Sequence, residues 1–220
     1  ITAHGFFSWV PDVVRDRLLA LCRQALSATG IAYVSYNALP GCHLRRLMWD
    51  MLRHHTRDIA DPRDRITAAR ALLEDLESDV AGSKLYGEVV RSEARDLLRR
   101  TETSVLFHDD MADTNQPFSI TDFAARAGAS GLRYLGEADY HEMSDSGLAT
   151  GARERLATRS GNDRLQREQY LDYLKGRRFR QTLLCHAEAP MTEGADAAMA
   201  RGLHAVGHLR MDPADGGAVD

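Results

Sequence analysis

Apolar and polar positions in the first part of the chain follow two different periods. Between Pro11 and Gly30, apolar residues recur at three- and four-residue spacing, which predicts a helix with one buried face. The run 31–36 is short and rich in β-branched and aromatic residues, and it predicts a strand. Residues 1–4 are also strand-like. A strand, a helix and a strand in succession predict a right-handed crossover between parallel strands, and therefore an α/β segment.

The middle of the chain changes to a helical pattern. Apolar stripes at 44–52, 66–80 and 85–100 predict three amphipathic helices, which we interpret as a packed helical insert. The α/β pattern returns near Pro117. It predicts a capped helix, a strand, a polar helix and a final strand, at 120–127, 132–137, 164–175 and 179–186. The predicted fold class is α/β and helix-rich.

Composition and charge narrow the class of protein. With 44% hydrophobic residues among 220, the chain can bury a substantial core, and no apolar stretch approaches the roughly 20 residues that span a bilayer. We therefore expect a cytoplasmic protein with no membrane partner. The net charge of −4 argues against a nucleic-acid partner, and we interpret the arginine pairs at 45–46, 99–100 and 177–178 as solvated faces.

The spacing of cysteines and histidines predicts no metal site. Cys22, Cys42 and Cys185 form no Cys-x-x-Cys pair, so we expect free thiols. His204 and His208 have the i,i+4 spacing of a helical metal pair, but the sequence offers no evident third ligand.

Three runs of the sequence are long and unusual. They are HGFFSWVP at 4–11, AYVSYN at 32–37 followed by Pro40-Gly41, and EQYLDY at 168–173 followed by FRQTLLCH at 179–186. In these runs the chain resembles bacterial class I S-adenosylmethionine-dependent methyltransferases that carry a methyltransferase regulatory domain.

The resemblance implies the carboxy-terminal half of a Rossmann-like class I methyltransferase sheet with a helical regulatory insert. Strand four would end at His4, strand five would be 31–36, and strands six and seven would lie near Leu132 and Thr182. Strands one to three are missing, and we find neither a glycine-rich turn after strand one nor an acidic residue that ends strand two. The chain is thus expected to need a partner, the missing amino-terminal methyltransferase half.

This implied arrangement divides the chain into four parts. We assign 1–43 to the methyltransferase sheet, 44–137 to the regulatory domain, 138–187 to a helical excursion with the last strand, and 188–220 to a tail or linker. An insert between strands five and six would place its helices beside the mouth where substrate enters, where they would act as a lid or substrate gate.

Candidate site residues follow from the strand order. In open α/β sheets the ligand lies beyond the carboxyl ends of the parallel strands, which are here the loops after strands four and five. The resemblance implies that the first loop borders the donor, S-adenosylmethionine, and the second the acceptor. We therefore predict cofactor contacts from His4, Phe6, Ser8 and Trp9, and catalytic roles for His4, Tyr36, Asn37 and His108.

These candidates also have plainer interpretations. Phe6, Phe7 and Trp9 would serve equally well as core aromatics at the start of a helix. His108 belongs to a His-Asp-Asp run at 108–110 and could act as a general base, or it could belong to a surface loop.

The resemblance implies the regulatory and substrate-selecting portion of an S-adenosylmethionine-dependent methyltransferase. Methyl transfer depends mainly on alignment of the reactants, so a chain without the donor-binding strands is expected to be inactive alone. The resemblance implies that some relatives with this arrangement methylate protein lysines, which makes a protein a candidate acceptor. The alternative is a noncatalytic helical module for protein interaction or dimerisation, which would make the chain a homodimer.

Overall fold

The computed structural model describes residues 1–80, 82–99, 106–191 and 201. Ile1–Ala189 form one compact unit. The predicted tail falls almost entirely outside the described residues, as do His204 and His208. Within the described ranges, no helix has the length and hydropathy needed to cross a bilayer, and no cluster of three or more potential metal ligands is found.

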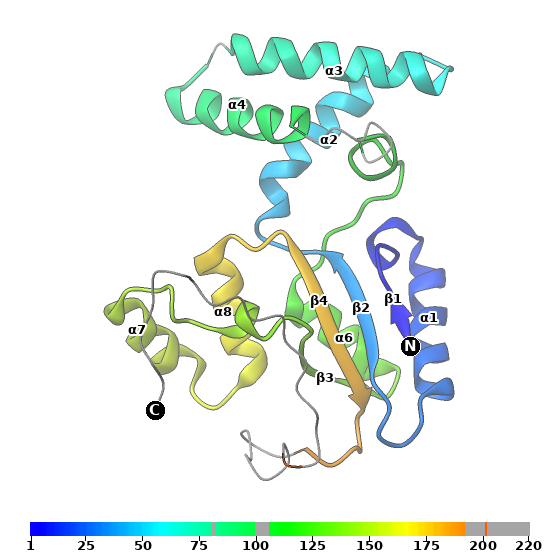
Figure 1. Ribbon diagram of the computed structural model, residues 1–220, viewed down its shortest axis with the longest axis vertical. Helices are drawn as coiled ribbons and strands as arrows, with labels where there is room; N and C mark the ends of the chain where they lie inside the picture. The colour runs from blue at the N-terminus through cyan, green and yellow to red at the C-terminus, as the bar shows by residue number, and fades with distance from the viewer. Residues whose placement is uncertain (81, 100–105, 192–200, 202–220) are drawn as a thin grey trace, which may run out of the picture. The chain divides into compact units, whose positions relative to one another are not determined.

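Figure 1 labels most of the helices and strands of the chain. In chain order the elements are β1 (Thr2–Ala3), η1 (Phe7–Trp9), α1 (Asp12–Ala25), β2 (Ala32–Asn37), α2 (Cys42–Thr56), α3 (Pro62–Ser78), α4 (Lys84–Leu98), η2 (Leu106–Asp110), α6 (Ile120–Ala129), β3 (Leu132–Glu137), η3 (Tyr140–Met143), α7 (Thr150–Ser160), α8 (Arg164–Lys175) and β4 (Phe179–His186).

The four strands form one mixed sheet in the order β1-β2-β4-β3 (Figure 1). β1 pairs with β2 in parallel, which confirms the crossover predicted for the first segment. β4 runs antiparallel to both of its neighbours, β2 and β3. The last two predicted strands match β3 and β4 residue for residue, whereas β2 begins one residue later than predicted and β1 ends before His4. The predicted helix-rich α/β class is confirmed.

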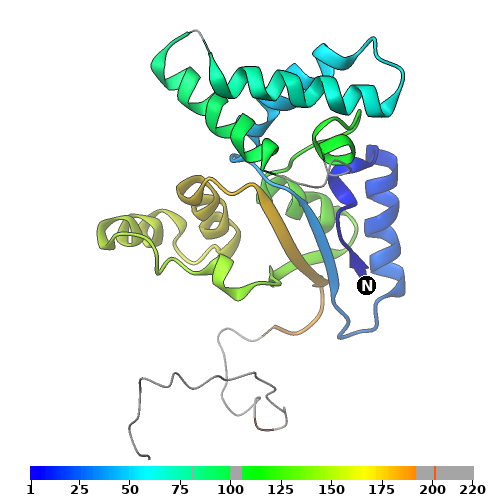
Figure 2. The same cartoon turned by 45° about the horizontal axis from the view of Figure 1, so that its top comes forward.

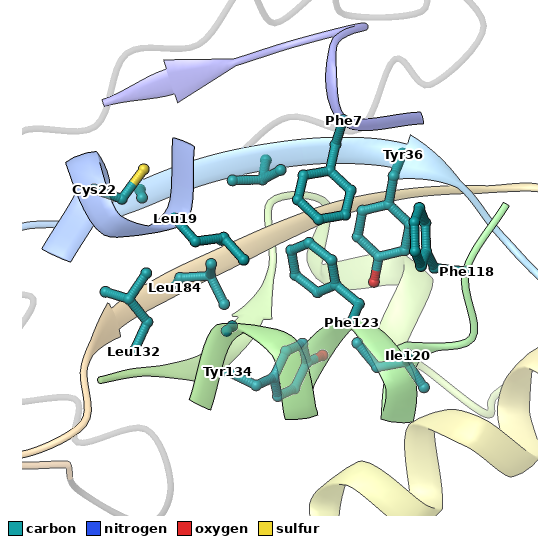
Figure 3. Packing of buried hydrophobic residues seen from close by; sticks show 13 residues of the cluster. Phe7, Leu19, Cys22, Tyr36, Phe118, Ile120, Phe123, Leu132, Tyr134 and Leu184 are labelled. Atoms are coloured by element: carbon teal, nitrogen blue, oxygen red, sulfur yellow. The ribbon is translucent and has the colours of Figure 1, made fainter. Parts of the chain in front are cut away.

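An aromatic core fixes the carboxyl ends of the first two strands to each other (Figure 3). Phe7 follows β1, Tyr36 lies near the end of β2, and Phe123 belongs to α6. The ring of Phe123 stacks on Tyr36 at 4.2 Å between centroids and meets Phe7 edge-on at 5.1 Å. Such pairs each contribute about 0.5 to 1.5 kcal/mol beyond the burial of their area.

The helical insert has a core of its own. Asp61 caps α3, with Pro62 in the first turn, and Ser83 caps α4. The buried side chains come from α2, α3, α4, η2 and the residue after it, and they are Met48, Leu52, Ala69, Leu73, Val90, Ala94, Leu97, Leu106 and Met111. Figures 1 and 2 show these helices beyond the carboxyl end of β2. The three predicted helices are confirmed within a few residues at each end.

Among the α-helices of the described residues, α7 (Thr150–Ser160) was not predicted. α7 is strongly polar, and only Leu156 and Ser160 of its residues are buried. α8, which was predicted, ends at Gly176, which adopts the left-handed conformation.

Candidate functional site

A cavity of about 220 Å³ lies at the carboxyl ends of β1 and β2. Its walls come from the loop after β1, the end of β2, the insert, and the start of β4. The lining residues are Trp9, Asn37, Cys42, Arg45, Trp49, Asp109, Asp110, Asn115, Arg178 and Phe179. The cavity therefore occupies the position where α/β sheets bind ligands, and the helical insert forms one side of it.

Arg15 of α1 fixes the loop that carries Trp9. Its side chain is buried, its Nε donates to the carbonyl oxygen of Phe7 at 2.8 Å, and its Nη1 donates to Gln116 Oε1 at 2.6 Å. The guanidinium also lies over the ring of Phe118, 5.0 Å from the centroid. A buried charge with this many partners holds the loop after β1 in one conformation.

Ser8 and Asn37, both predicted site residues, are brought together by a hydrogen bond. Ser8 Oγ accepts from the backbone N–H of Asn37 at 2.8 Å, and Asn37 Nδ2 donates to Asn115 Oδ1 at 2.8 Å. Asn115 Nδ2 donates in turn to the carbonyl oxygen of Asp109 at 2.7 Å. Ser8 is fully buried. This chain of hydrogen bonds ties the first loop, β2 and η2 together around the cavity.

The indole groups of the cavity differ in their hydrogen bonding. Trp49 Nε1 donates to Asp110 Oδ1 at 2.8 Å. Trp9 Nε1 is buried and has no hydrogen-bond partner among the described residues. An unsatisfied buried donor costs about 1 to 3 kcal/mol, so this N–H is suited to an acceptor atom of a ligand.

Glu93 of α4 joins the insert to the sheet. It is 2% exposed and lies between two arginines of the cavity wall. Arg178, just before β4, donates to both of its carboxylate oxygens, and Arg45 of α2 places Nε 3.1 Å from Oε2. Arg45 is itself buried, with 6% exposure. The clamp formed by Glu93, Arg45 and Arg178 connects α2 and α4 to the start of β4.

The backbone segments that directly precede α2 and β4 also touch. Gly41 N donates to the carbonyl oxygen of Arg177 at 2.9 Å. A Cβ at position 41 would lie 2.2 Å from the carbonyl oxygen of Gly176, so no side chain fits there. Glycine is required at this position by close approach rather than by its backbone angles.

His4 follows β1 and so lies at the same end of the sheet as the cavity. Its ring is exposed and meets the ring of Phe179, a cavity residue, edge-on at 6.0 Å between centroids. His4 Nδ1 is 2.9 Å from Tyr33 Oη. The structure thus brings four predicted residues, His4, Ser8, Trp9 and Asn37, to one end of the sheet.

Phe6, Tyr36 and His108 do not line this cavity. Phe6 is 39% exposed on the loop after β1. Tyr36 is buried in the aromatic core with its Oη 3.2 Å from Thr182 Oγ1, and burial raises the pKa of this phenol. His108 lines a separate small hollow beside Arg65, although its neighbours Asp109 and Asp110 line the cavity. The roles predicted for these residues stay predictions.

Sequence reasoning missed the arginines of the site. The interpretation of the 45–46 and 177–178 pairs as solvated faces is wrong for Arg45 and Arg177, each 6% exposed. Both are buried because carboxylates from other elements reach them, Glu93 for Arg45 and Asp172 for Arg177. The one signal in the sequence was the position of Arg177 and Arg178 directly before an unusual run.

A second buried charge cluster holds α8 against the sheet. Arg180 of β4 is 1% exposed and donates to Asp172 Oδ1 at 2.8 Å and to Glu168 Oε2 at 3.1 Å. It also pairs with Glu137 of β3. Including Arg177, three carboxylates face two guanidinium groups. Burial raises the pKa of Asp172 to about 6.

The comparisons with known proteins relate this chain to methyltransferases that carry a regulatory domain. Residues 102–186 match the family model described as the predicted methyltransferase regulatory domain, whereas we had assigned 44–137 to it; the ranges share 102–137. The uncharacterized protein RP789 of Rickettsia prowazekii (strain Madrid E) is 38% identical over 187 residues, which are 84% of this chain and 33% of that protein. The uncharacterized protein sll1526 of Synechocystis is 23% identical over 96% of this chain and 40% of its own length.

A solved structure is similar over most of the described fold. It is that of PKMT2 from Rickettsia typhi in complex with AdoHcy, with a TM-score of 0.77 and 31% identity. The match covers 89% of this chain and 37% of that chain. This chain therefore spans about a third of the length of RP789 and of PKMT2.

Proposed function

We propose that this chain supplies the part of an S-adenosylmethionine-dependent methyltransferase that binds the methyl acceptor. The basis is its relation to methyltransferases that carry a regulatory domain. The observation that carries this proposal is the cavity at the carboxyl ends of β1 and β2, with the insert as one wall. A wall that belongs to an inserted segment suits substrate selection, because the insert can vary without changing the sheet.

The residues of this chain fit one side of the methyl donor. Phe6 offers an exposed ring at the carboxyl end of β1, and Gly5, with a φ of +59°, has no atom within 4 Å of the position of a Cβ. The flat adenine ring of the donor could pack against the ring of Phe6 in this open loop. The donor's ribose and amino-acid end need a glycine-rich turn and an acidic residue from outside this chain.

The edge of β1 is where the missing strands are proposed to pair. β1 is an edge strand, hydrogen-bonded only to β2 within the described sheet. Ile1, with 44% exposure, and Ile31, with 45%, leave apolar side chains at that end. An unpaired edge with apolar residues is a template for another strand. The preceding methyltransferase half is the proposed partner.

The cavity lining favours an amine acceptor on a protein. Trp9, Trp49 and Phe179 suit the methylene stem of such a group, and the carboxylates of Asp109 and Asp110 suit its ammonium.

Calorimetric titration with S-adenosylmethionine tests the division of labour. We expect saturable binding by the full product of the gene and none by this chain alone. Micromolar binding by this chain would contradict our assignment of the donor site. A full product that binds the donor but transfers no methyl group to protein, peptide or free amines would contradict the proposed reaction.

A dimerisation module is the second candidate, favoured by one observation. Leu44 and Leu47 of α2 and Leu85 of α4 are exposed, with 42%, 36% and 73% of their surface accessible. Burial of leucine side chains at a self-interface would remove them from water. Sedimentation velocity over a hundredfold range of concentration tests this: a monomer throughout would exclude the homodimer.

A further inference from the structure

We propose that Tyr33 and Gln181 are positioning residues that hold His4 in a single tautomer, with Nδ1 protonated and Nε2 left as a proton acceptor. The proposal rests on the proposed function, since it concerns the same end of the sheet, and it names residues that the sequence did not single out. Its three members come from three neighbouring strands or their ends.

Strand pairing explains why these side chains meet. Val34 and Tyr36 belong to the core, so the alternating residues of β2, Tyr33 and Ser35, lie on the opposite face of the sheet. Gln181 is the partner of Ser35 across the β2-β4 pair and therefore shares that face. His4 follows β1, on the other side of β2.

The direction of the hydrogen bonds fixes the proton on His4. Tyr33 has one hydroxyl proton, and its Oη donates that proton to Gln181 Oε1 at 2.7 Å. The same Oη lies 2.9 Å from His4 Nδ1. Two acceptors without a proton between them would repel each other at that distance, so Nδ1 must donate. Burial raises the pKa of Tyr33, which keeps its proton in place.

Two further contacts hold the imidazole in this position. Ser35 Oγ lies 3.2 Å from His4 Nδ1 and accepts from Gly5 N at 2.8 Å, so it anchors the residue next to His4. Phe179 packs against the ring at 6.0 Å between centroids. His4 Nε2 has no hydrogen-bond partner among the described residues. A neutral imidazole with Nδ1 protonated has its lone pair on Nε2.

The fixed tautomer supplies a base for methyl transfer. A protonated acceptor atom loses its proton to His4 Nε2, and its lone pair forms the bond to the methyl carbon. The bond between that carbon and the sulfonium sulfur breaks, and its electron pair stays on sulfur. His4 is then an imidazolium, which returns the proton to water. Positioned general bases contribute about 10²-fold to 10⁴-fold to a rate.

Nitrogen-15 NMR of the histidine side chains tests the tautomer directly in this chain. We would record spectra at a pH of about 8.5, where an ordinary imidazole with a pKa near 6.5 is neutral. The resonances of His4 are assigned by their loss in His4→Gln. The variants are Gln181→Met and Tyr33→Phe, and the matched control is Tyr134→Phe on β3, whose hydroxyl has no hydrogen-bond partner among the described residues.

We expect Nδ1 to carry the proton in the wild type and in Tyr134→Phe. Gln181→Met removes the acceptor of the Tyr33 proton, which then turns toward Nδ1, so the predominant tautomer changes to Nε2–H. Tyr33→Phe removes the hydroxyl that contacts both His4 Nδ1 and Gln181 Oε1, so we expect a mixture of the two His4 tautomers. A purely structural role for Gln181 predicts no change of tautomer. Nε2–H in the wild type, or an unchanged tautomer in Gln181→Met, would overturn the proposal.

The kinetic arm uses the full product of the gene and keeps the two proposals separable. There we expect Gln181→Met to lower kcat at least tenfold with the KM for the donor within twofold. A changed tautomer without any methyl transfer in the wild type would count against the proposed function alone. An active enzyme in which Gln181→Met leaves kcat unchanged would count against the base alone.

Discussion

Arg15 shows how a charged residue can serve as an internal support. A helix that begins with a polar first turn would ordinarily expose its arginine, yet this one is 1% exposed because the loop after β1 supplies carbonyl acceptors. The guanidinium can meet several acceptors at fixed angles, which an ammonium cannot. The loop that carries Trp9 therefore depends on a residue eight positions beyond Phe7.

We predict that Arg15→Met destabilises the chain by about 3 kcal/mol, because it leaves the Phe7 carbonyl buried without its donor and removes the bond to Gln116. Urea unfolding followed by circular dichroism measures the change. The control is Arg17→Met, an exposed arginine on the same helix, for which we expect a change within about 0.5 kcal/mol. Equal losses in both variants would contradict the assignment.

The charge cluster around Arg180 predicts a dependence of stability on pH. Burial raises the pKa of Asp172 from 3.8 to about 6, so the folded chain binds this proton more tightly than the unfolded chain. The contribution of the group to stability is then complete below pH 4 and is lost as the pH rises through 6. Asp172→Asn cannot titrate at this position.

We therefore expect the difference in free energy of unfolding, wild type minus Asp172→Asn, to fall by about 2 to 3 kcal/mol between pH 4 and pH 7. Urea unfolding at several pH values checks it. A difference that rises over this range would mean that Arg177 and Arg180 outweigh burial and lower the pKa of this carboxyl.

At the scale of elements, the clamp around Glu93 decides how α2 and α4 meet β4. Loss of one partner of a buried ion pair costs about 3 to 5 kcal/mol, and the 38% exposure of Arg178 places this case at the lower end. We predict that Glu93→Gln destabilises the insert by about 3 kcal/mol. Hydrogen exchange should then be faster in α2 and α4 than in the sheet.

Glu88→Gln is the matched control for that prediction. Glu88 lies on the same helix with 57% of its side chain exposed, and its pair with Lys84 is a surface pair. We expect its exchange rates to equal those of the wild type. If Glu93→Gln also leaves exchange in α2 unchanged, the clamp does not hold the insert.

The sequence predicted regular elements well where one face is apolar. β3, β4 and the three helices of the insert have clear periods, and their bounds agree with the structure closely. α7 was missed because it buries only Leu156 and Ser160 and so has almost no stripe. The antiparallel direction of β4 was also not predicted, because the residue pattern within a strand does not indicate which strand it pairs with or in which direction.

The candidate site was predicted only in part, for a related reason. His4 and Trp9 follow β1 and Asn37 ends β2, and strand order alone brings them to one end of the sheet. Arg45 and Trp49 lie on α2, and they reach the cavity through the fold of the insert. Tyr36 alternates into the core, which the register of β2 determines.

At the scale of the whole molecule, the free edge of β1 is the feature that a longer protein should change. We predict that the backbone amides of β1 exchange with solvent at least tenfold more slowly in the full product of the gene, because a neighbouring strand would pair with that edge. β3, the edge strand at the other side of the sheet, is the internal control. Hydrogen exchange with mass spectrometry measures both. Equal rates for β1 in the two proteins would contradict the proposed pairing.

The contact of Gly41 with the backbone of Gly176 and Arg177 has a practical meaning for protein engineering. Any side chain at position 41 would push the backbone before α2 away from the backbone before β4. Gly41 should therefore be left unchanged in engineered variants. α3 and α4 are connected at the end of these two helices that lies away from Gly41 (Figure 1). Reporter groups, affinity tags or exchanged recognition loops are therefore best inserted at that connection, where they leave the contact of Gly41 with Gly176 and Arg177 intact.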